Sequence, residues 1–473
     1  MKDSAIYKPM FESIPNVKIL INIGALMDIP TGSYLKGKHG ESILNGGLGL
    51  ITGIAGRGNM FKSTIMHYMM LSAADKMNRN YPVSMSTYDT EINIHESHLS
   101  EFVKPFKSFD PYGIFTNQQW LITDKTIYYG DEWFEILKTF LQEKTKNKDK
   151  LLVETPFLSR DGKTLLKMIP PTFSEIDSFS EFETSDVAKI QNENLLGEAG
   201  GNTIHMRQGL AKTRLLMELP NIAGSSNHFV LTTVQVGQAI NIQSGPISLP
   251  PPKKLQHMRS GEKFNGVTDK FFFLTSNFWQ AISANPLINQ TTKGVEYPKN
   301  QDDTVQGDYD LNIVTLKQLR GKSGPSGSVV EIIVSQREGV LASLTEFHYI
   351  KSQDRYGISG TLQHYNLDLM PEVKLSRTTV RSKIDSDPAL QRALNITAEM
   401  CQIKQYWRDL PEGILCTPAE LYNDLKALGY DWNVLLATRG WWTVDNDKTD
   451  IPFLSTMDLL LMRKGQYKPY WMK

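Results

Sequence analysis

The strongest pattern in the chain is an apolar run followed by a segment with helical spacing. Residues 48–55 form the apolar run, which predicts a strand, and after Thr64 apolar positions recur with a helical period to about Met77. The turn between the two segments contains Gly56 and Gly58. We therefore expect a strand, a glycine-containing loop and a helix in immediate succession.

Similar patterns further along the chain predict an alternation of strands and helices. Short runs rich in β-prone residues indicate strands, and recurring apolar positions indicate helices. The capping box from Thr417 to Glu420, with Pro418 at the first helical position, predicts a helix that stops at Gly429. The expected strands are 82–88, 172–176, 228–234, 269–276, 311–316, 329–334 and 345–350, and the expected helices are 130–150, 204–222 and 417–428.

Polar stretches rich in glycine or proline separate these elements. We interpret 156–171 as an insertion or loop, 179–203 and 237–266 as long loops, 285–310 as a polar excursion and 317–327 as a basic, glycine-rich turn. Strands that alternate with helices after the first strand, loop and helix predict an α/β fold with a mostly parallel, twisted sheet.

The chain is long enough for two or three domains. Residues 1–46 are interpreted as a lead-in segment and residues 47–352 as the α/β core, with insertions at about 101–170 and 277–310. The composition changes near residue 353, and we expect 353–473 to form a small C-terminal domain.

Composition restricts the class of protein. The net charge is zero, so any contact with nucleic acid must come from local basic patches. The two cysteines lie outside any metal-binding or redox motif, which favours a reducing compartment. No apolar run approaches the roughly 20 residues that a membrane span needs. We expect a soluble, cytosolic protein without membrane contact.

The first loop has the chemistry of a phosphate-binding loop. Its small residues let backbone N–H groups point at phosphate oxygens, Lys62 supplies a positive charge, and the Ser63 hydroxyl can bind Mg²⁺. The usual pattern has glycine before the lysine, whereas this chain has Phe61. The alternative is a strand–helix turn with a chance lysine. The expected nucleotide-binding residues are Gly56, Arg57, Gly58, Asn59, Met60, Phe61, Lys62, Ser63 and Thr64.

Polar residues at later strand ends supply the other parts of an ATP-hydrolysing site. Glu91 is a candidate for the base that activates water, Asp177 for the Mg²⁺ shell and Gln235 for sensing the γ-phosphate. Taken singly, Asp177 suits a helix N-cap and Glu91 a solvated turn. Their order along the chain favours catalysis. Basic side chains that neutralise charge in the transition state complete the expected catalytic set, for which the candidates are Lys317, Arg320 and Lys322.

These motifs together resemble the RecA family of ATPases over roughly residues 25–350. The phosphate loop, with Phe61 before Lys62, is similar to that of phage recombinases of the UvsX type, and the segments 88–91 and 176–178 are similar to the strands that carry the family's catalytic glutamate and its Walker B aspartate. The resemblance implies ATP and Mg²⁺ as cofactors. It places His98 where relatives carry a tyrosine that stacks on adenine.

The basic segment 317–327 also looks like a segment of DnaB-type hexameric replicative helicases, in which Lys and Arg reach the neighbouring subunit's site. Both resemblances imply a homo-oligomer, either a helical filament or a hexameric ring, with shared ATP sites. Because only about 50 residues precede the phosphate loop, without an obvious helicase-type N-terminal domain, we favour the recombinase.

The two long loops stand where the recombinase family has its DNA-binding loops. We expect single-stranded DNA as the partner, strand exchange as the activity, and a loader or single-strand-binding protein as a further partner. The alternatives are a ring helicase and a non-motor P-loop nucleotide-binding module. The residues expected to contact DNA are Arg207, Lys253, Lys254 and Arg259.

Overall fold

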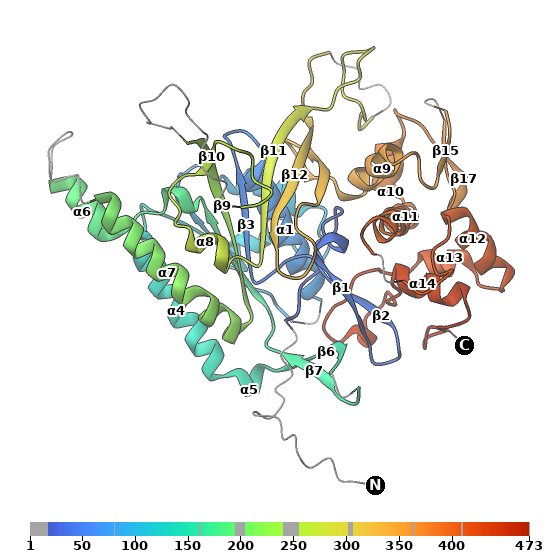
Figure 1. Cartoon of the computed structure of the whole chain (residues 1–473), viewed down its shortest axis with the longest axis horizontal. Helices are drawn as coiled ribbons and strands as arrows, with labels where there is room; N and C mark the ends of the chain where they lie inside the picture. The colour runs from blue at the N-terminus through green and yellow to red at the C-terminus, as the bar shows by residue number, and fades with distance from the viewer. Residues whose placement is uncertain are drawn as a thin grey trace, which may run out of the picture.

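A large central sheet organises the molecule in the computed structural model (Figure 1). Among the described residues its strand order is β14-β13-β12-β11-β3-β9-β8-β4-β5, with β10 paired to the end of β9. The structure describes residues 18–79, 81–159, 162–193, 204–239, 255–300, 306–361, 364–407 and 410–472.

Most of this sheet is parallel, as predicted. The parallel strands are β5 (Trp120–Asp124), β4 (Met85–Asp89), β8 (Thr172–Asp177), β9 (His228–Gln238), β3 (Ile51–Gly56) and β11 (Asn277–Pro286). The antiparallel strands are β12 (Leu311–Gly321), β13 (Val329–Ser335) and β14 (Gly339–Val340) at one edge, and β10 (Glu262–Phe264). The carboxyl ends of the parallel strands therefore meet at one edge, where ligands bind in open α/β sheets.

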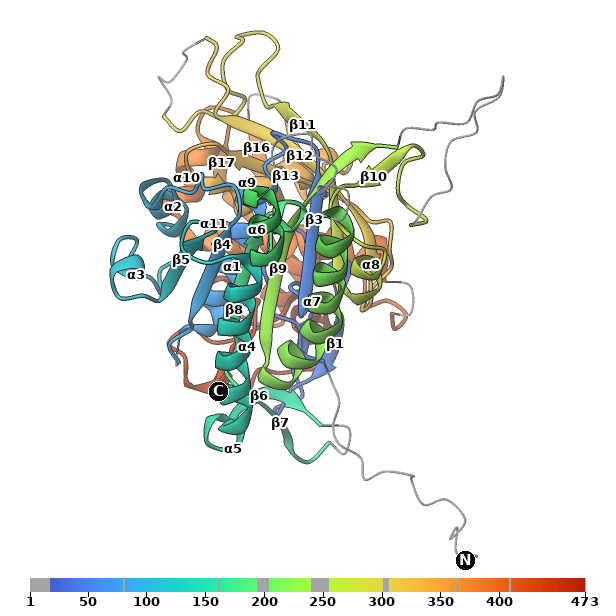
Figure 2. The ribbon, with the colours of Figure 1, turned by 90° about the vertical axis from the view of Figure 1, so that its left-hand side faces the viewer.

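Helices cover both faces of the sheet (Figures 1 and 2). Helix α1 (Lys62–Met77) packs on one face against β3, β8 and β9, and α7 (Ile204–Ser226), with α4 (Gly130–Lys146) beside it, covers the other. Because strand residues alternate between faces, Ile54 joins the buried cluster on the α1 side and Ile51 joins the cluster on the α7 side.

Shorter elements surround this core. A hairpin of β1 (Ser33–Lys36) and β2 (Ser42–Asn45) precedes β3, and a second hairpin joins β6 (Val153–Leu158) to β7 (Leu165–Met168). The remaining short elements before α9 are η1 (Ile29–Thr31), α2 (Glu96–Val103), α3 (Gly113–Thr116), α5 (Lys148–Leu151), η2 (Phe179–Glu181), α6 (Ser185–Glu193) and α8 (Lys270–Leu274).

The C-terminal region packs directly on the core. Helix α11 (Pro388–Tyr406) lies against α9 (Ala342–Ser352), and the ring of the buried Trp442 lies 4.9 Å from that of Phe157 in the β6–β7 hairpin. One buried apolar cluster contains residues of both regions. The other elements are β15 (Ile358–Gly360), β16 (Tyr365–Leu367), β17 (Met370–Leu375), α10 (Val380–Ser386), α12 (Pro418–Ala427), α13 (Trp432–Leu436), η4 (Asn446–Lys448) and α14 (Thr456–Arg463).

Several local predictions are confirmed. The strand and helix around the phosphate loop are present, and so is the helix that opens at Thr417, whose side chain accepts from the Glu420 N–H at 3.2 Å. Gly429 follows that helix with a φ of +87°. None of the described helices is long and apolar enough to cross a membrane.

Other local predictions are wrong. The expected strand 269–276 is helix α8, and the sheet strand begins at Asn277, inside the expected insertion and ahead of the expected polar excursion. The expected strand 345–350 is helix α9. A short apolar run is compatible with either structure, and here packing decided it: α8 buries Phe271 and Phe272 and exposes Phe273.

Three of the expected loops contain regular structure. Segment 156–171 holds parts of the β6–β7 hairpin, and segment 179–203 holds η2 and α6, with residues 194–203 outside the described residues. Segment 237–266 includes the end of β9 and all of β10, which pair with each other, while residues 240–254 lie outside the described residues. The basic turn is shorter than expected, because β12 continues to Gly321.

Candidate functional site

The phosphate loop joins β3 to α1 at the carboxyl edge of the sheet. Phe61 has a φ of 54° and Asn59 a φ of 58°, so both occupy the left-handed region that favours glycine. Phe61 is partly buried and packs against the α1-side apolar cluster, which holds the ring in place. The loop thus keeps the backbone shape that glycine would give at this position, with a side chain that anchors it.

The start of α1 presents backbone donors to this loop. The hydrogen bond from the Ile65 N–H to the Phe61 carbonyl is 3.0 Å long and opens the helix. The N–H groups of Lys62, Ser63 and Thr64 therefore belong to the first turn, where a helix has no acceptors of its own for them. Together with the positive end of the helix dipole, they form a donor set suited to a phosphate.

Lys62 is buried at the base of the loop. Its Nζ donates to the Arg57 carbonyl at 2.8 Å. A Cβ atom on Gly56 would lie 3.2 Å from Lys62 Cδ, so the glycine makes room for the lysine stem. Burial lowers the pKa of Lys62, and the negative charges of Asp177 and Glu91 act in the opposite direction. The lysine therefore lies within the electrostatic reach of both predicted carboxylates.

Asp177 ends β8, and Asp89 is its register partner at the end of β4. Asp177 is buried, and its Oδ1 accepts a 2.5 Å hydrogen bond from the Thr233 hydroxyl of β9. The peptide bond between Asp177 and Ser178 is cis. Helix α1, which carries Ser63, packs on β8. Two neighbouring strands thus hold this carboxylate at the sheet edge.

Asp89 fixes the turn that presents Glu91. Its carboxylate accepts hydrogen bonds from four successive N–H groups, those of Glu91, Ile92, Asn93 and Ile94, at 2.8 to 2.9 Å. The Glu91 side chain itself is exposed and accepts from Asn93 Nδ2 at 3.1 Å. Asp89 is a positioning residue that sequence reasoning did not assign, although its place two residues before Glu91 at a strand end was the available signal.

Thr90 joins the two carboxylate-bearing strand ends. Its N–H and hydroxyl donate to the Asp177 carbonyl at 2.7 and 2.9 Å, and its Oγ1 accepts from the Ser178 N–H at 2.7 Å. The distance between the turn that holds Glu91 and the end of β8 is therefore set by backbone contacts.

Gln235 lies beside the phosphate loop. It is the register partner of Gly56 on adjacent parallel strands, so the last residue of β3 and the predicted sensor are neighbours. The Gln235 N–H donates to the Ser180 hydroxyl at 2.9 Å, and its carbonyl accepts from the Asn265 N–H at 2.9 Å. The backbone of Gln235 is thus paired with the last residue of β3 and is bonded to both segments 179–203 and 237–266.

His98 stands on α2 with an exposed side chain, and its ring lies 4.5 Å from that of Phe102. Burial lowers the pKa of His98. Beside Thr64 the surface has a small hollow of about 10 Å³ whose lining includes Phe102 and Tyr68, but not His98.

The three basic candidates lie on or just after β12, two strands from β3. Lys317 of β12 is level with Ala55 of β3, because both are register partners of the same residue of β11. In the same way, Arg320 is level with Gly53 of β3. Arg320 is therefore about 10 Å from Gly56 along the strand direction, because Gly53 is three residues before Gly56. It is also about 10 Å from β3 across the sheet, because β12 is two strands away. The Arg320 guanidinium instead covers the exposed ring of Phe273 at 5.7 Å.

Lys322 follows the end of β12, and its N–H donates to the Ser276 carbonyl at 3.1 Å. Ser276 precedes β11, so Lys322 lies further still from the phosphate-loop edge than Arg320. The structure thus brings Lys62, Glu91, Asp177 and Gln235 to one edge and leaves Arg320 and Lys322 away from it.

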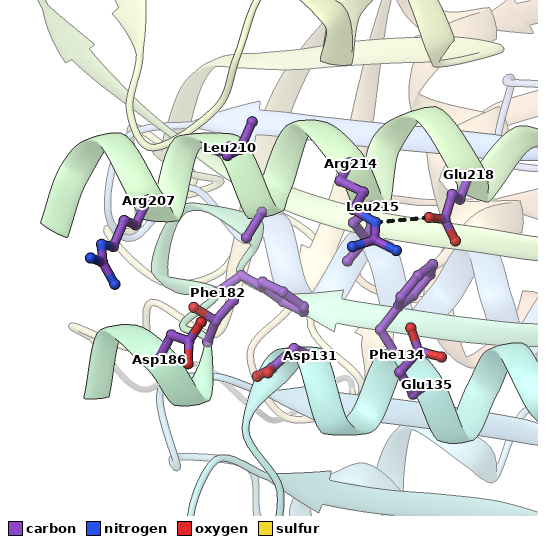
Figure 3. Close-up of a pocket in the computed structure, with 12 residues that line it drawn as sticks. Asp131, Phe134, Glu135, Phe182, Asp186, Arg207, Leu210, Arg214, Leu215 and Glu218 are labelled. Atoms are coloured by element: carbon purple, nitrogen blue, oxygen red, sulfur yellow. Dashed lines mark hydrogen bonds and ion pairs between the residues drawn. The ribbon is translucent and has the colours of Figure 1, made fainter. Parts of the chain in front are cut away.

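The two described residues that are expected to contact DNA belong to different segments of the chain. Arg207 lines a groove of about 460 Å³ between α4, α6 and α7, in which the side chains of α7 face those of α4 and α6 (Figure 3). Arg259 is exposed and precedes β10, while Lys253 and Lys254 lie outside the described residues. The groove is a surface feature of the helical layer and contains none of the predicted catalytic residues.

The chemistry of the site fits a magnesium nucleotide. In the part of the chain that the structure describes, no three His, Cys, Asp or Glu side chains are grouped to hold a metal ion. Mg²⁺ at phosphate sites typically needs one or two protein oxygens, with water and phosphate completing its shell. Ser63 and Asp177 supply oxygens of that kind. No protein-family model matches the chain, and no curated protein matches it either.

Proposed function

We propose that the protein is a RecA-like ATPase that binds single-stranded DNA and promotes strand exchange in phage-like recombination, repair or replication. The observation that carries this proposal is the meeting of Lys62, Glu91 and Asp177 at one sheet edge, with Gln235 beside the phosphate loop. The fold supports the proposal at the level of an α/β sheet with a phosphate loop at its carboxyl edge.

Each residue has a distinct task in the proposed hydrolysis. Lys62 and the first-turn N–H groups of α1 bind the β- and γ-phosphates. Ser63 and Asp177 would hold Mg²⁺ through their side-chain oxygens. When bound, Mg²⁺ neutralises charge on the phosphates. Glu91 orients a water molecule and accepts its proton as the water attacks the γ-phosphorus. The bond from the γ-phosphorus to the bridging oxygen breaks, and ADP and phosphate are released. The hydrogen bonds that Asp89 accepts from the turn after β4 fix the position of the Glu91 backbone at the edge of the site.

Arg320 at the end of β12 and Lys322 just after it suit a site on the neighbouring subunit. Arg320 and Lys322 lie away from the phosphate loop of their own chain. A head-to-tail assembly would let them stabilise the transition-state charge of the next subunit, in the manner of an arginine finger. The predicted homo-oligomer is therefore part of the proposed mechanism.

A ring helicase is the second candidate, because the same basic segment suits a subunit-shared site in either assembly. Electron microscopy with an ATP analogue and single-stranded DNA separates the two. We expect helical filaments that coat the DNA. Closed six-fold rings without filaments would overturn the recombinase proposal in favour of the helicase.

The enzyme proposal is tested by ATP hydrolysis with and without single-stranded DNA. We expect Lys62→Ala to lower the DNA-stimulated rate by roughly a hundredfold or more, because it removes the charge that holds the phosphates. Lys107→Ala, at an exposed lysine after α2, is the control and should keep the wild-type rate. Equal rates for wild type and Lys62→Ala would favour a non-motor nucleotide-binding module.

A further inference from the structure

A buried lysine lies between the two segments proposed to contact DNA. Lys212 of α7 is 2 % exposed, and its Nζ donates to the Ser180 carbonyl at 2.8 Å and to the Gly266 carbonyl at 3.0 Å. The ammonium also lies 5.6 Å from the centre of the Phe179 ring. The side chain thus binds two backbone carbonyls, one from each segment.

These two carbonyls belong to the bases of the segments. Ser180 follows Asp177 by three residues, at the start of segment 179–203, and Gly266 ends segment 237–266. The Ser180 hydroxyl donates to the Asn265 carbonyl at 2.9 Å and accepts from the Gln235 N–H at 2.9 Å. The contact between the two segment bases therefore lies next to the end of β8, which carries Asp177, and is bonded to Gln235 of β9.

The packing at this junction is close. Gly266 has a φ of +65°, and a Cβ atom there would lie 2.5 Å from the Ser180 carbonyl oxygen. Such a contact is too short for any other residue without displacing Ser180. The two segment bases are thus in direct contact, with the Lys212 ammonium bridging them.

The lysine is costly at this position if stability is its only role. An ammonium loses several kcal/mol of solvation on burial unless it is fully compensated. Burial lowers the pKa of Lys212 to about 8, opposed by the charge of Glu181. Arg214, two residues further along the helix, is instead 77 % exposed and paired with Glu218.

We propose that Lys212 is a positioning residue that holds the bases of the two segments together. Because of this contact, the backbone at Ser180 and the backbone at Gly266 shift together when ATP binds. This inference rests on the proposed function, because the shared shift matters only if the segments contact DNA. A signal from the γ-phosphate through Gln235 would then reach both segments through Ser180 and Lys212. Without the lysine, the segments would respond separately.

The test compares Lys212→Met with Arg214→Met in the full chain. We expect Lys212→Met to keep the DNA-independent ATPase rate and its KM for ATP near the wild-type values. The stimulation of that rate by single-stranded DNA should fall at least about tenfold, the size of a typical coupling between two sites. Arg214→Met should keep the wild-type stimulation.

Hydrogen exchange gives a second readout. In the absence of nucleotide and DNA, Lys212→Met should raise amide exchange in 179–193 and 255–266 together, and Arg214→Met should raise it in neither. Gly266→Ala, which presses on the Ser180 carbonyl while keeping the lysine, should reproduce the loss of stimulation. It replaces Lys212→Met in the test if that variant does not fold.

The outcomes separate the two proposals. Wild-type stimulation and exchange in Lys212→Met, or in Gly266→Ala where it serves as the replacement, would overturn the role of Lys212 and leave the proposed function standing. A wild-type protein whose ATP hydrolysis does not respond to single-stranded DNA overturns the proposed function, and the coupling role with it.

Discussion

Gly56 and Gln235 are register partners on adjacent parallel strands, although the first ends the phosphate-loop strand and the second precedes a proposed DNA-binding segment. Neighbours in a sheet lie about 5 Å apart across the strands. If ATP binds as proposed, a change at its γ-phosphate therefore has a short physical route to Gln235. The backbone of Gln235 in turn is bonded to Ser180 and Asn265.

This relationship predicts the behaviour of Gln235→Ala. The variant should keep the wild-type affinity for ATP, because the proposed role of Gln235 is to sense the γ-phosphate and not to bind the nucleotide. Its ATPase stimulation by single-stranded DNA should fall by about tenfold or more. Gln238→Ala, at the exposed end of the same strand, is the matched control and should behave as wild type. Weaker ATP binding in Gln235→Ala would assign the glutamine to nucleotide binding instead.

Glu91→Gln should separate binding from turnover. The amide keeps the shape of the side chain but cannot accept a proton from water, so hydrolysis should fall roughly a hundredfold or more. Binding of a fluorescent ATP analogue should stay near the wild-type value. Glu96→Gln, at the exposed start of α2, should keep both properties. If Glu91→Gln folds normally and loses ATP binding, Glu91 is not the base.

Glu346 should make stability depend on pH. It is buried on α9 and accepts from Asn395 Nδ2 of α11 at 3.0 Å. Burial raises the pKa of Glu346 to about 8, whereas the unfolded chain has a value of about 4.3. The folded state thus binds the extra proton between these values. The stability that this proton contributes is complete below about pH 4.3 and is lost as pH rises through about 8.

Glu346→Gln removes this titration and keeps the acceptor for Asn395. We expect the variant to match wild type near pH 4 and to be more stable at pH 8, by up to about 4 kcal/mol. Urea unfolding across this range measures the difference. Glu372→Gln, at an exposed glutamate of β17, should leave the pH profile unchanged. A constant difference between wild type and Glu346→Gln at all pH values would refute the assignment.

The adjacent tryptophans Trp441 and Trp442 should differ sharply when each is replaced by alanine. Trp442 is fully buried against Phe157, so Trp442→Ala should lower the free energy of unfolding by about 3 to 5 kcal/mol. Trp441 is only half-buried, and its ring lies 5.2 Å from the guanidinium of Arg79, so Trp441→Ala should cost about 1 to 2 kcal/mol. Thermal or urea unfolding measures both values. Equal losses would contradict the packing of the C-terminal region on the core.

Local patterns predicted the strand, loop and helix that carry the candidate nucleotide-binding residues. The strand, loop and helix from 48 to about 77 follow from neighbouring residues, because their periods and turn residues are encoded within a few positions. Asp177 ends β8 and Glu91 follows the end of β4 by two residues, since a strand that stops at a polar residue is also a local signal. The role of Asp89 was missed because its four hydrogen bonds depend on how the chain turns after β4.

Tertiary packing decided what local patterns leave open. Residues 269–276 and 345–350 are apolar enough for strands, yet helices α8 and α9 form there because the sheet and its neighbours bury them in that form.

The sequence by itself predicted a mostly parallel α/β sheet and a glycine-containing loop between a strand and a helix, because short-range patterns encode each of those features. Only the tertiary structure placed Gln235 beside Gly56 and buried Lys212 between two carbonyls far apart in sequence. The physical reason is that strand register and the burial of a charge are set by contacts between distant segments. No local pattern of polar and apolar residues encodes those contacts.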